Sequence, residues 1–142
     1  MYDKLLVAVD HSDSTGRVVD AARELALLAN GEVWVLHLQE RSVPGKVPIG
    51  PGLTSDETIL EAQAAVDAMV GELTRAGIKA HGEVRHTLFG YAAREIVEDA
   101  KGHDVDAIVM GSRGHGDLAG LVLGSTAHKV IHLADRPVLV VR

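Results

Sequence analysis

The chain contains no cysteine, and its aromatic residues are scarce: one tryptophan, two tyrosines and one phenylalanine among 142 residues. The lack of cysteine excludes disulfide scaffolds, thiolate zinc sites and cysteine nucleophiles. The few aromatics disfavour a surface that stacks nucleic-acid bases. Acidic residues outnumber basic ones by 20 to 14, which leaves a formal net charge of −6. Because a general nucleic-acid binder needs a positive surface, we expect no nucleic-acid partner.

Long apolar runs are also missing. The first apolar run stops at Asp10, which makes it too short and too acidic for a secretory signal. No run approaches the roughly 20 apolar residues of a membrane-spanning helix. We therefore expect a soluble, cytoplasmic protein with no membrane partner. The length suits one domain over residues 1–142, because a chain of this size can bury a core of its own.

Apolar patterns divide the chain into alternating strands and helices. Continuous apolar runs indicate strands buried on both faces, and alternation of apolar and polar residues indicates a half-exposed edge strand. Between these segments, apolar residues recur at helical spacing. This alternation predicts an α/β fold, in which helices cover both faces of a parallel sheet. The predicted strands are 5–9, 33–38, 78–86, 107–110 and 137–141, and the predicted helices lie within 18–29, 59–73, 92–100 and 127–134.

Residues 40–55 differ in composition from the rest of the chain. They hold three of the four prolines, with glycines between them, and show no apolar periodicity. Connections of this length are uncommon and often act as ligand-covering lids or lack fixed structure. We expect a surface loop that covers a ligand or is poorly ordered.

Residues 111–126 form a glycine-rich connection between a buried strand and a helix. Glycine lets backbone N–H groups approach an anion, and a helix N-terminus favours phosphate. The same pattern also arises where glycines only turn the chain and Ser125 or Thr126 only caps the helix. No Walker A motif occurs, which excludes the usual P-loop phosphate transfer. Residues 114–119 match the dinucleotide pattern Gly-x-Gly-x-x-Ala, but they follow the fourth strand rather than the first, so we interpret this match as accidental.

The spacing Gly111-x2-Gly114-x9-Gly124-Ser125 resembles the ATP-binding branch of the universal stress protein family. The resemblance extends over the chain: residues 5–10 look like the family's opening strand with its acidic end. It implies a Rossmann-like sheet of five parallel strands in the order 3-2-1-4-5, with four helices. In that order the first and fourth strands are neighbours, at a topological switch point where open α/β sheets bind ligands.

The resemblance also implies a role for particular residues. Asp10 would lie near the ribose and adenine, and the backbone of Leu38 would contact the adenine. His11 departs from the glycine that is common in the family, which affects the orientation of Asp10. The adenine pocket would be lined by Ala8, Leu38 and Met110, and the phosphates and part of the ribose would be held by Gly111, Gly114, Gly124, Ser125 and Thr126.

The remaining polar residues give weaker signals. The eight histidines show no pairing with carboxylates at a zinc-ligand spacing, and His115, His128 and His132 are expected on the surface. Arg113 and Lys129 are candidates to offset phosphate charge. Mg²⁺ would be held through water by Asp10 or Asp117. We expect residues 94–95 and 98–99 on the solvated face of the third helix, and no Gly-x-Ser-x-Gly nucleophile motif is present.

Three functions fit these observations. The favoured one is an ATP-binding stress-response regulator, whose nucleotide-bound state is read by a regulatory partner protein; a cyclic-nucleotide binder is a variant of it. The second is a slow ATP hydrolase, although no positioned base is evident and no catalytic residue is predicted. The third is a dimeric scaffold without nucleotide.

The apolar last strand, 138–141, lies at an edge of the expected sheet, and pairing with a second copy would cover it. We therefore predict a homodimer.

Overall fold

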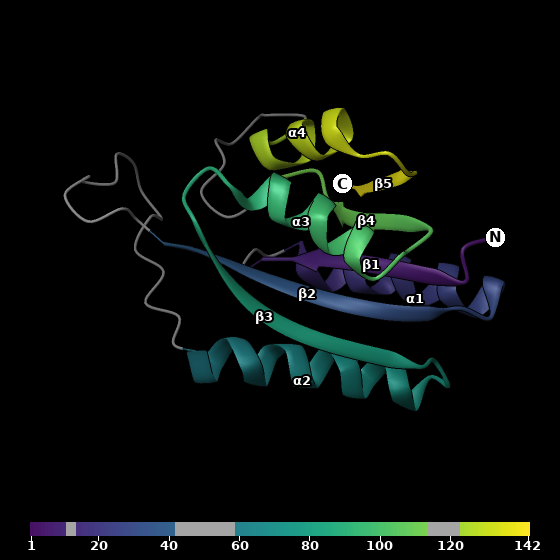
Figure 1. Cartoon of the computed structure of the whole chain (residues 1–142). Helices are drawn as coiled ribbons and strands as arrows, with labels where there is room; N and C mark the ends of the chain where they lie inside the picture. Colours follow the sequence, from purple (N-terminus) through teal and green to yellow (C-terminus); the bar gives the residue numbers. More distant parts are fainter. Residues whose placement is uncertain (11–13, 42–58, 114–122) are drawn as a thin grey trace.

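Five parallel strands form one open sheet in the order β3-β2-β1-β4-β5 (Figure 1). The computed structural model describes residues 1–10, 14–41, 59–113 and 123–142. This arrangement confirms the predicted α/β fold and strand order. The strands are β1 (Lys4–Val9), β2 (Glu32–Arg41), β3 (Ala80–Leu88), β4 (Ala107–Gly111) and β5 (Val138–Val141), and the helices are α1 (Thr15–Ala29), α2 (Ile59–Arg75), α3 (Ala92–Gly102) and α4 (Ser125–Leu133).

Two apolar layers cover the two faces of the sheet. Alternate residues of β1 belong to different layers, because successive side chains of a strand point to opposite faces. Leu5 and Val7 pack with buried residues of α1 and α2. Leu6 and Ala8 pack with buried residues of α3 and α4. Figure 1 shows α3 and α4 on one side of the sheet and α2 on the other.

Strand β2 is longer than the sequence pattern predicts. Its apolar run ends at Leu38, but Glu40 and Arg41 remain in register with Thr87 and Leu88 of β3. The first two residues of the predicted 40–55 loop therefore belong to β2. Backbone pairing with β3 extends the strand there, although both residues are polar. Residues 42–55 of that loop lie outside the described residues, so its role as a lid stays a prediction.

Two glycines allow close approach of other parts of the chain. A Cβ on Gly31 would lie 2.6 Å from the carbonyl oxygen of Tyr2, and a Cβ on Gly82 would collide with Val66 of α2. The turn before Gly31 is made by Asn30, which has a left-handed φ of 53° at the end of α1. Helix α1 thus ends at Ala29, as the predicted range 18–29 has it, and asparagine makes the left-handed turn after it.

Strand β5 is an edge strand, as the sequence predicted. It pairs with β4, and Leu139 is 43% exposed. An exposed apolar edge of this kind is open to pairing with another strand. No helix of the described residues is long and apolar enough to cross a membrane.

Glu32, the first residue of β2, contacts basic side chains on both sides of its strand. Its carboxylate lies 3.9 Å from Lys4 Nζ, 3.4 Å from Lys79 Nζ and 3.3 Å from His81 Nε2. Partial burial alone would raise the pKa of Glu32, but the contacts with His81 and Lys79 and the charge of Lys4 hold that pKa below its usual value. The ionised carboxylate therefore stabilises the folded state.

We expect Glu32→Gln to lower the free energy of unfolding at pH 7 by less than about 1 kcal/mol, as for other partly exposed ion pairs. A lowered pKa gives stability that is present above the unfolded-state pKa and is lost as the pH falls through the folded-state pKa. The difference between Glu32→Gln and the parent should therefore shrink once the pH falls below the usual pKa of glutamate, and vanish below the lowered folded-state pKa. Urea denaturation at pH 7 and pH 3 measures it, and a difference as large at pH 3 as at pH 7 contradicts the expectation.

Candidate functional site

The carboxyl ends of β1 and β4 lie next to each other and form the switch point of the sheet. Ala8 and Met110 are partners in the register of these strands. Asp10 follows β1 directly, and Gly111 ends β4. The other neighbour of β1 is β2. Helix α1, which follows β1, and helix α4, which follows β4, pack on different faces of the sheet. Ligands of open α/β sheets bind in the crevice at such a point.

Three residues predicted to line an adenine pocket lie on one face of the sheet. Ala8 and Met110 are buried in the apolar layer beneath α3 and α4, and the partly exposed Leu38 packs against the same layer. The last registered pair of β1 and β2 is Val9 with His37. Leu38 is therefore one residue past this pair, at the mouth of the crevice.

The start of α1 lies against the end of β4. Thr15 Oγ1 donates a hydrogen bond of 2.9 Å to the carbonyl oxygen of Asp10. A Cβ on Gly111 would lie 3.4 Å from Ser14 Oγ and 3.3 Å from the carbonyl oxygen of Arg113. Ser14 is the N-cap residue of α1, although its side chain makes no capping hydrogen bond. The contact of Ser14 with Gly111 joins segments almost 100 residues apart, so it depends on tertiary packing.

Backbone hydrogen bonds hold together the two ends of the glycine-rich connection. The Ser112 N–H donates to the carbonyl oxygen of Val141 at 2.8 Å, and the Gly124 N–H donates to the carbonyl oxygen of Ser112. These bonds place the start of α4 beside the carboxyl ends of β4 and β5. Ser112 is buried, and the sequence analysis did not single it out. Gly114, His115 and Asp117 lie outside the described residues.

The N-terminus of α4 carries three of the predicted phosphate-binding residues. Gly124 is its buried N-cap residue, Ser125 is exposed and Thr126 is half-buried. No side chain caps this helix within the described part of the chain, so the N–H groups of its first turn are available to a ligand. Gly124 has φ −71° and ψ 162°, which any residue adopts. Turn geometry therefore does not explain the glycine, whereas close approach of another group would.

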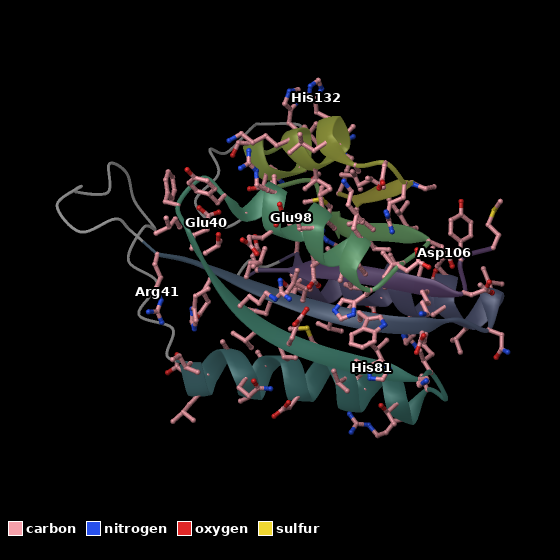
Figure 2. The ribbon with its side chains drawn as sticks, viewed as in Figure 1. Glu40, Arg41, His81, Glu98, Asp106 and His132 are labelled. Carbon is pink, nitrogen blue, oxygen red and sulfur yellow. The ribbon has the colours of Figure 1, made fainter. Side chains whose placement is uncertain are left out.

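The predicted surface histidines of α4 are exposed, as expected. Figure 2 shows His132 on the outer side of α4, and His128 is also exposed. Lys129, a candidate to offset phosphate charge, lines a cavity of about 230 Å³ between α3 and α4 together with Arg94, Tyr91 and Leu133. This cavity does not include the switch-point residues.

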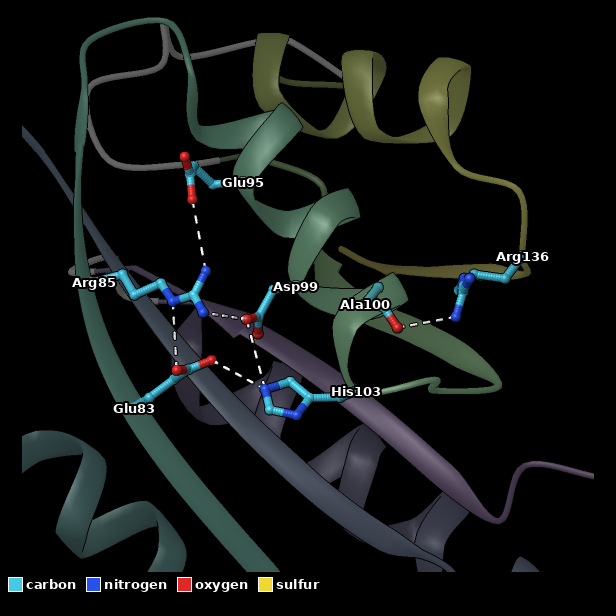
Figure 3. Close-up of polar contacts among 7 residues, drawn as sticks. All are labelled: Glu83, Arg85, Glu95, Asp99, Ala100, His103 and Arg136. Atoms are coloured by element: carbon cyan, nitrogen blue, oxygen red, sulfur yellow. Dashed lines mark hydrogen bonds and ion pairs between the residues drawn. The ribbon is translucent and has the colours of Figure 1, made fainter.

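A second polar group, which the sequence analysis missed, lies between β3 and α3 (Figure 3). The Arg85 guanidinium contacts Glu83 at 3.4 Å, Asp99 at 3.0 Å and Glu95 at 3.7 Å. The Asp99 side chain is 1% exposed. The expectation that residues 98–99 face solvent is therefore wrong for Asp99, although Glu98 is exposed. We call Glu83, Arg85, Glu95, Asp99 and His103 the β3–α3 cluster.

Asp99 and Glu83, two carboxyls of the β3–α3 cluster, have pKa values shifted in opposite directions. Burial, and then the adjoining Glu83 carboxyl, raise the pKa of Asp99 to about 6. Burial alone would raise the pKa of Glu83, but its contact with Asp99 and the charge of Arg85 hold it below its usual value. His103 Nε2 lies 3.4 Å from Glu83 and 3.6 Å from Asp99. His103, the residue after α3, is therefore paired with two carboxyls, one of them four residues earlier in the chain, a spacing that the sequence analysis did not single out.

Comparisons with known proteins agree with the fold. A family model described as the universal stress protein family matches residues 1–142. Universal stress protein YxiE of Bacillus subtilis (strain 168) is 33% identical, over 100% of both chains. A solved structure of a universal stress protein from Archaeoglobus fulgidus in complex with dAMP is 31% identical, with a TM-score of 0.65, over 99% of this chain and 98% of that chain. The structure of MJ0577, a universal stress protein of Methanocaldococcus jannaschii, has a TM-score of 0.81 at 27% identity, over 99% of this chain and 96% of that chain.

Proposed function

The chain belongs to the universal stress protein family, and we propose that it binds ATP at the switch point between β1 and β4 as a stress-response regulator. The observation that carries this proposal is the N-terminus of α4, which no side chain of the described residues caps, held by the Gly124–Ser112 hydrogen bond beside the ends of β4 and β5. Free N–H groups at a helix N-terminus bind phosphate. The dAMP complex of the Archaeoglobus fulgidus relative supports an adenine nucleotide as the ligand class.

Each predicted residue has a role in this proposal. Phosphate oxygens would accept hydrogen bonds from the N–H groups of Ser125 and Thr126 and from their hydroxyls. Gly124, whose own N–H donates to Ser112, would leave room for phosphate to approach them. Gly111, and Gly114 beyond the described residues, would let the backbone approach the same groups. Ala8, Met110 and the backbone of Leu38 would enclose the adenine, and Asp10 would contact the ribose. Mg²⁺ bound to the phosphates would be held through water by Asp10, because Mg²⁺ keeps several waters and takes few carboxylates.

Binding rather than turnover is the proposed activity. Nucleotide occupancy would order the connections on either side of the crevice, and a regulatory partner protein would read that state.

We also propose that two copies pair through the exposed edge of β5, because Leu139 is 43% exposed there and such an edge is a pairing template. Sedimentation velocity measures this directly, and a monomer at micromolar concentration would rule it out.

Calorimetric titration with ATP, Mg²⁺-ATP and cyclic AMP tests the ligand. We expect one site per chain and a lower dissociation constant for ATP than for cyclic AMP, because the N-terminus of α4 favours additional negative charge. Mass spectrometry of nucleotide released from the purified protein gives an independent identification. Absence of binding for all three nucleotides, together with no released nucleotide, would leave the dimeric scaffold as the function.

A further inference from the structure

Three side chains of the β3–α3 cluster are of types that bind metal ions: Glu83, Asp99 and His103. They lie between β3 and the end of α3, away from the β1–β4 switch point. Glu83 comes from β3, and Asp99 and His103 come from the C-terminal half of α3 and the residue after it. One potential ligand atom from each lies within 4.8 Å of the other two. Figure 3 shows the three groups converging on one point, with His103 Nε2 directed toward both carboxyls.

The separations of these atoms match those of ligands that share one ion. His103 Nε2 lies 3.4 Å from Glu83 Oε1 and 3.6 Å from Asp99 Oδ1. Zinc binds imidazole nitrogen and carboxylate oxygen at about 2.0–2.2 Å. Two ligands at tetrahedral angles around such an ion are separated by roughly 3.3–3.6 Å, from the same bond lengths. The two separations from His103 therefore match those of ligands around one tetrahedral ion, and the two carboxylate oxygens lie within 4.8 Å of each other.

The buried carboxyl of Asp99 provides an independent reason to expect a ligand. Its side chain is 1% exposed, and its Oδ2 atom is buried without a hydrogen-bond partner within the described part of the chain. A buried carboxylate oxygen without a partner is costly. Two groups can satisfy it: a proton shared with Glu83, or a cation bound between the carboxyls.

The charge of the cluster favours the cation. Glu83, Glu95 and Asp99 supply three negative charges when ionised, and Arg85 supplies one positive charge. With a neutral imidazole the cluster has a net charge of −2, which one divalent cation neutralises. The ion would displace the Arg85 guanidinium from Asp99 Oδ1, which it now contacts at 3.0 Å. Arg85 is 42% exposed and also contacts Glu95 at 3.7 Å, so it keeps a carboxylate partner after that displacement.

The ring of His103 is held in a binding orientation by a stack of aromatic rings. Trp34 of β2 lies between His103 and His81, with ring centroids 4.0 Å and 4.1 Å away, respectively. The stack restricts rotation of the His103 ring and leaves its Nε2 edge facing the carboxyls. Spacing of four residues places Asp99 and His103 on one face of α3, which is how helices commonly present pairs of metal ligands.

We propose that Glu83, Asp99 and His103 bind a divalent transition-metal ion of the zinc class, with water as the fourth ligand. One imidazole and two carboxylates suit zinc better than the all-oxygen sites of magnesium and calcium. The bound ion links the edge strand β3 to the end of α3. It is separate from the proposed nucleotide crevice, so its presence does not depend on ATP binding.

Titration of the dialysed 142-residue chain with Zn²⁺ alone tests the proposal. Trp34 is the only tryptophan and stacks on His103, so its fluorescence reports directly on the site. We expect saturation at one Zn²⁺ per chain, a higher melting temperature that a chelator reverses, and intense visible absorption when Co²⁺ replaces Zn²⁺. A parent protein that shows no fluorescence change and no stabilisation by Zn²⁺ overturns the proposal, and the buried carboxyls then share a proton.

Matched variants identify the ligands. His103→Gln and Glu83→Gln should each weaken Zn²⁺ binding at least about tenfold, while each variant keeps the circular dichroism spectrum of the parent. His81→Gln is the control, because His81 stacks on the other face of Trp34 and contacts Glu32 instead. We expect it to bind Zn²⁺ within about twofold of the parent. Zn²⁺ binding that survives both His103→Gln and Glu83→Gln, or that is lost in His81→Gln alone, places the ion elsewhere and overturns the proposal.

Discussion

Replacing Gly124 with valine is expected to weaken ATP binding about 100-fold. Gly124 occupies the N-cap position of α4 with φ −71° and ψ 162°, a conformation that valine adopts without strain. The branched side chain would instead keep phosphate away from the N–H groups of the first turn. Hydrogen bonds to a charged group contribute about 1.5–3 kcal/mol each, and loss of about 2.7 kcal/mol corresponds to a 100-fold higher dissociation constant.

Two other variants separate this effect from a general loss of stability. Ser125→Ala removes one hydroxyl donor and leaves the backbone path open, so we expect a loss of only about threefold to tenfold. Gly102→Val is the matched control, because a Cβ there meets no atom within 4 Å and the residue ends α3. Calorimetry measures the affinities, and circular dichroism verifies the fold. If valine at position 124 distorts the buried N-cap, Gly124→Ala provides the smaller substitution. A folded Gly124 variant that binds ATP as tightly as the parent shows that phosphate does not bind at α4.

Replacing Arg136 with alanine is expected to lower the free energy of unfolding by about 2–4 kcal/mol. The Arg136 guanidinium donates to the carbonyl oxygens of Ala100 at 2.9 Å and Val105 at 2.6 Å; Figure 3 shows the first of these bonds. Its side chain is only 16% exposed. The bonds tie the connection before β5 to the end of α3. Hydrogen bonds with a charged donor contribute about 1.5–3 kcal/mol each, and water entering the site recovers part of that loss.

Arg23→Ala is the control for loss of an arginine. Arg23 contacts Asp20 one turn earlier in α1 at 3.4 Å, and its side chain is 39% exposed. Such exposed pairs contribute about 0.3–0.5 kcal/mol. Arg136→Lys should recover only part of the lost stability, because one ammonium group does not reproduce the fork of a guanidinium. Denaturant unfolding at pH 7 measures all three variants. Similar losses for Arg136→Ala and Arg23→Ala would show that the two bonds contribute little.

Sequence patterns predicted the elements that apolar burial creates. The run of residues 5–9 forms a strand buried on both faces, and the alternation in 78–86 forms the edge strand β3. Apolar periodicity was less informative where backbone pairing, rather than burial of apolar side chains, holds a residue in a strand. Glu40 and Arg41 are polar, yet they extend β2 because β3 offers backbone partners there. Ile131 continues the apolar spacing of α4, yet it is 47% exposed, because this short helix buries Ala127 and Val130.

The β3–α3 cluster shows why a buried polar residue escapes sequence analysis. Glu98 and Asp99 are adjacent acidic residues on one helix, and apolar periodicity alone assigns both to solvent. Asp99 is buried because the helix turns it toward Glu83 and Arg85, which come from a strand more than ten residues earlier in the chain. The spacing of Asp99 and His103 was visible as a signal, but it becomes meaningful only once Glu83 is placed beside them.

The amino-acid sequence by itself determined the alternation of strands and helices, the exclusion of cysteine chemistry and the glycine spacing that resembles the universal stress protein family. These properties depend on residue type and on short-range periodicity, which the linear chain already contains. Only the tertiary structure decided that Gly124 has an ordinary φ, that Ser14 lies against Gly111, and that Asp99 is buried beside Glu83 and His103. Each of these depends on crossover connections that bring distant segments together, and no local pattern encodes the distances between them.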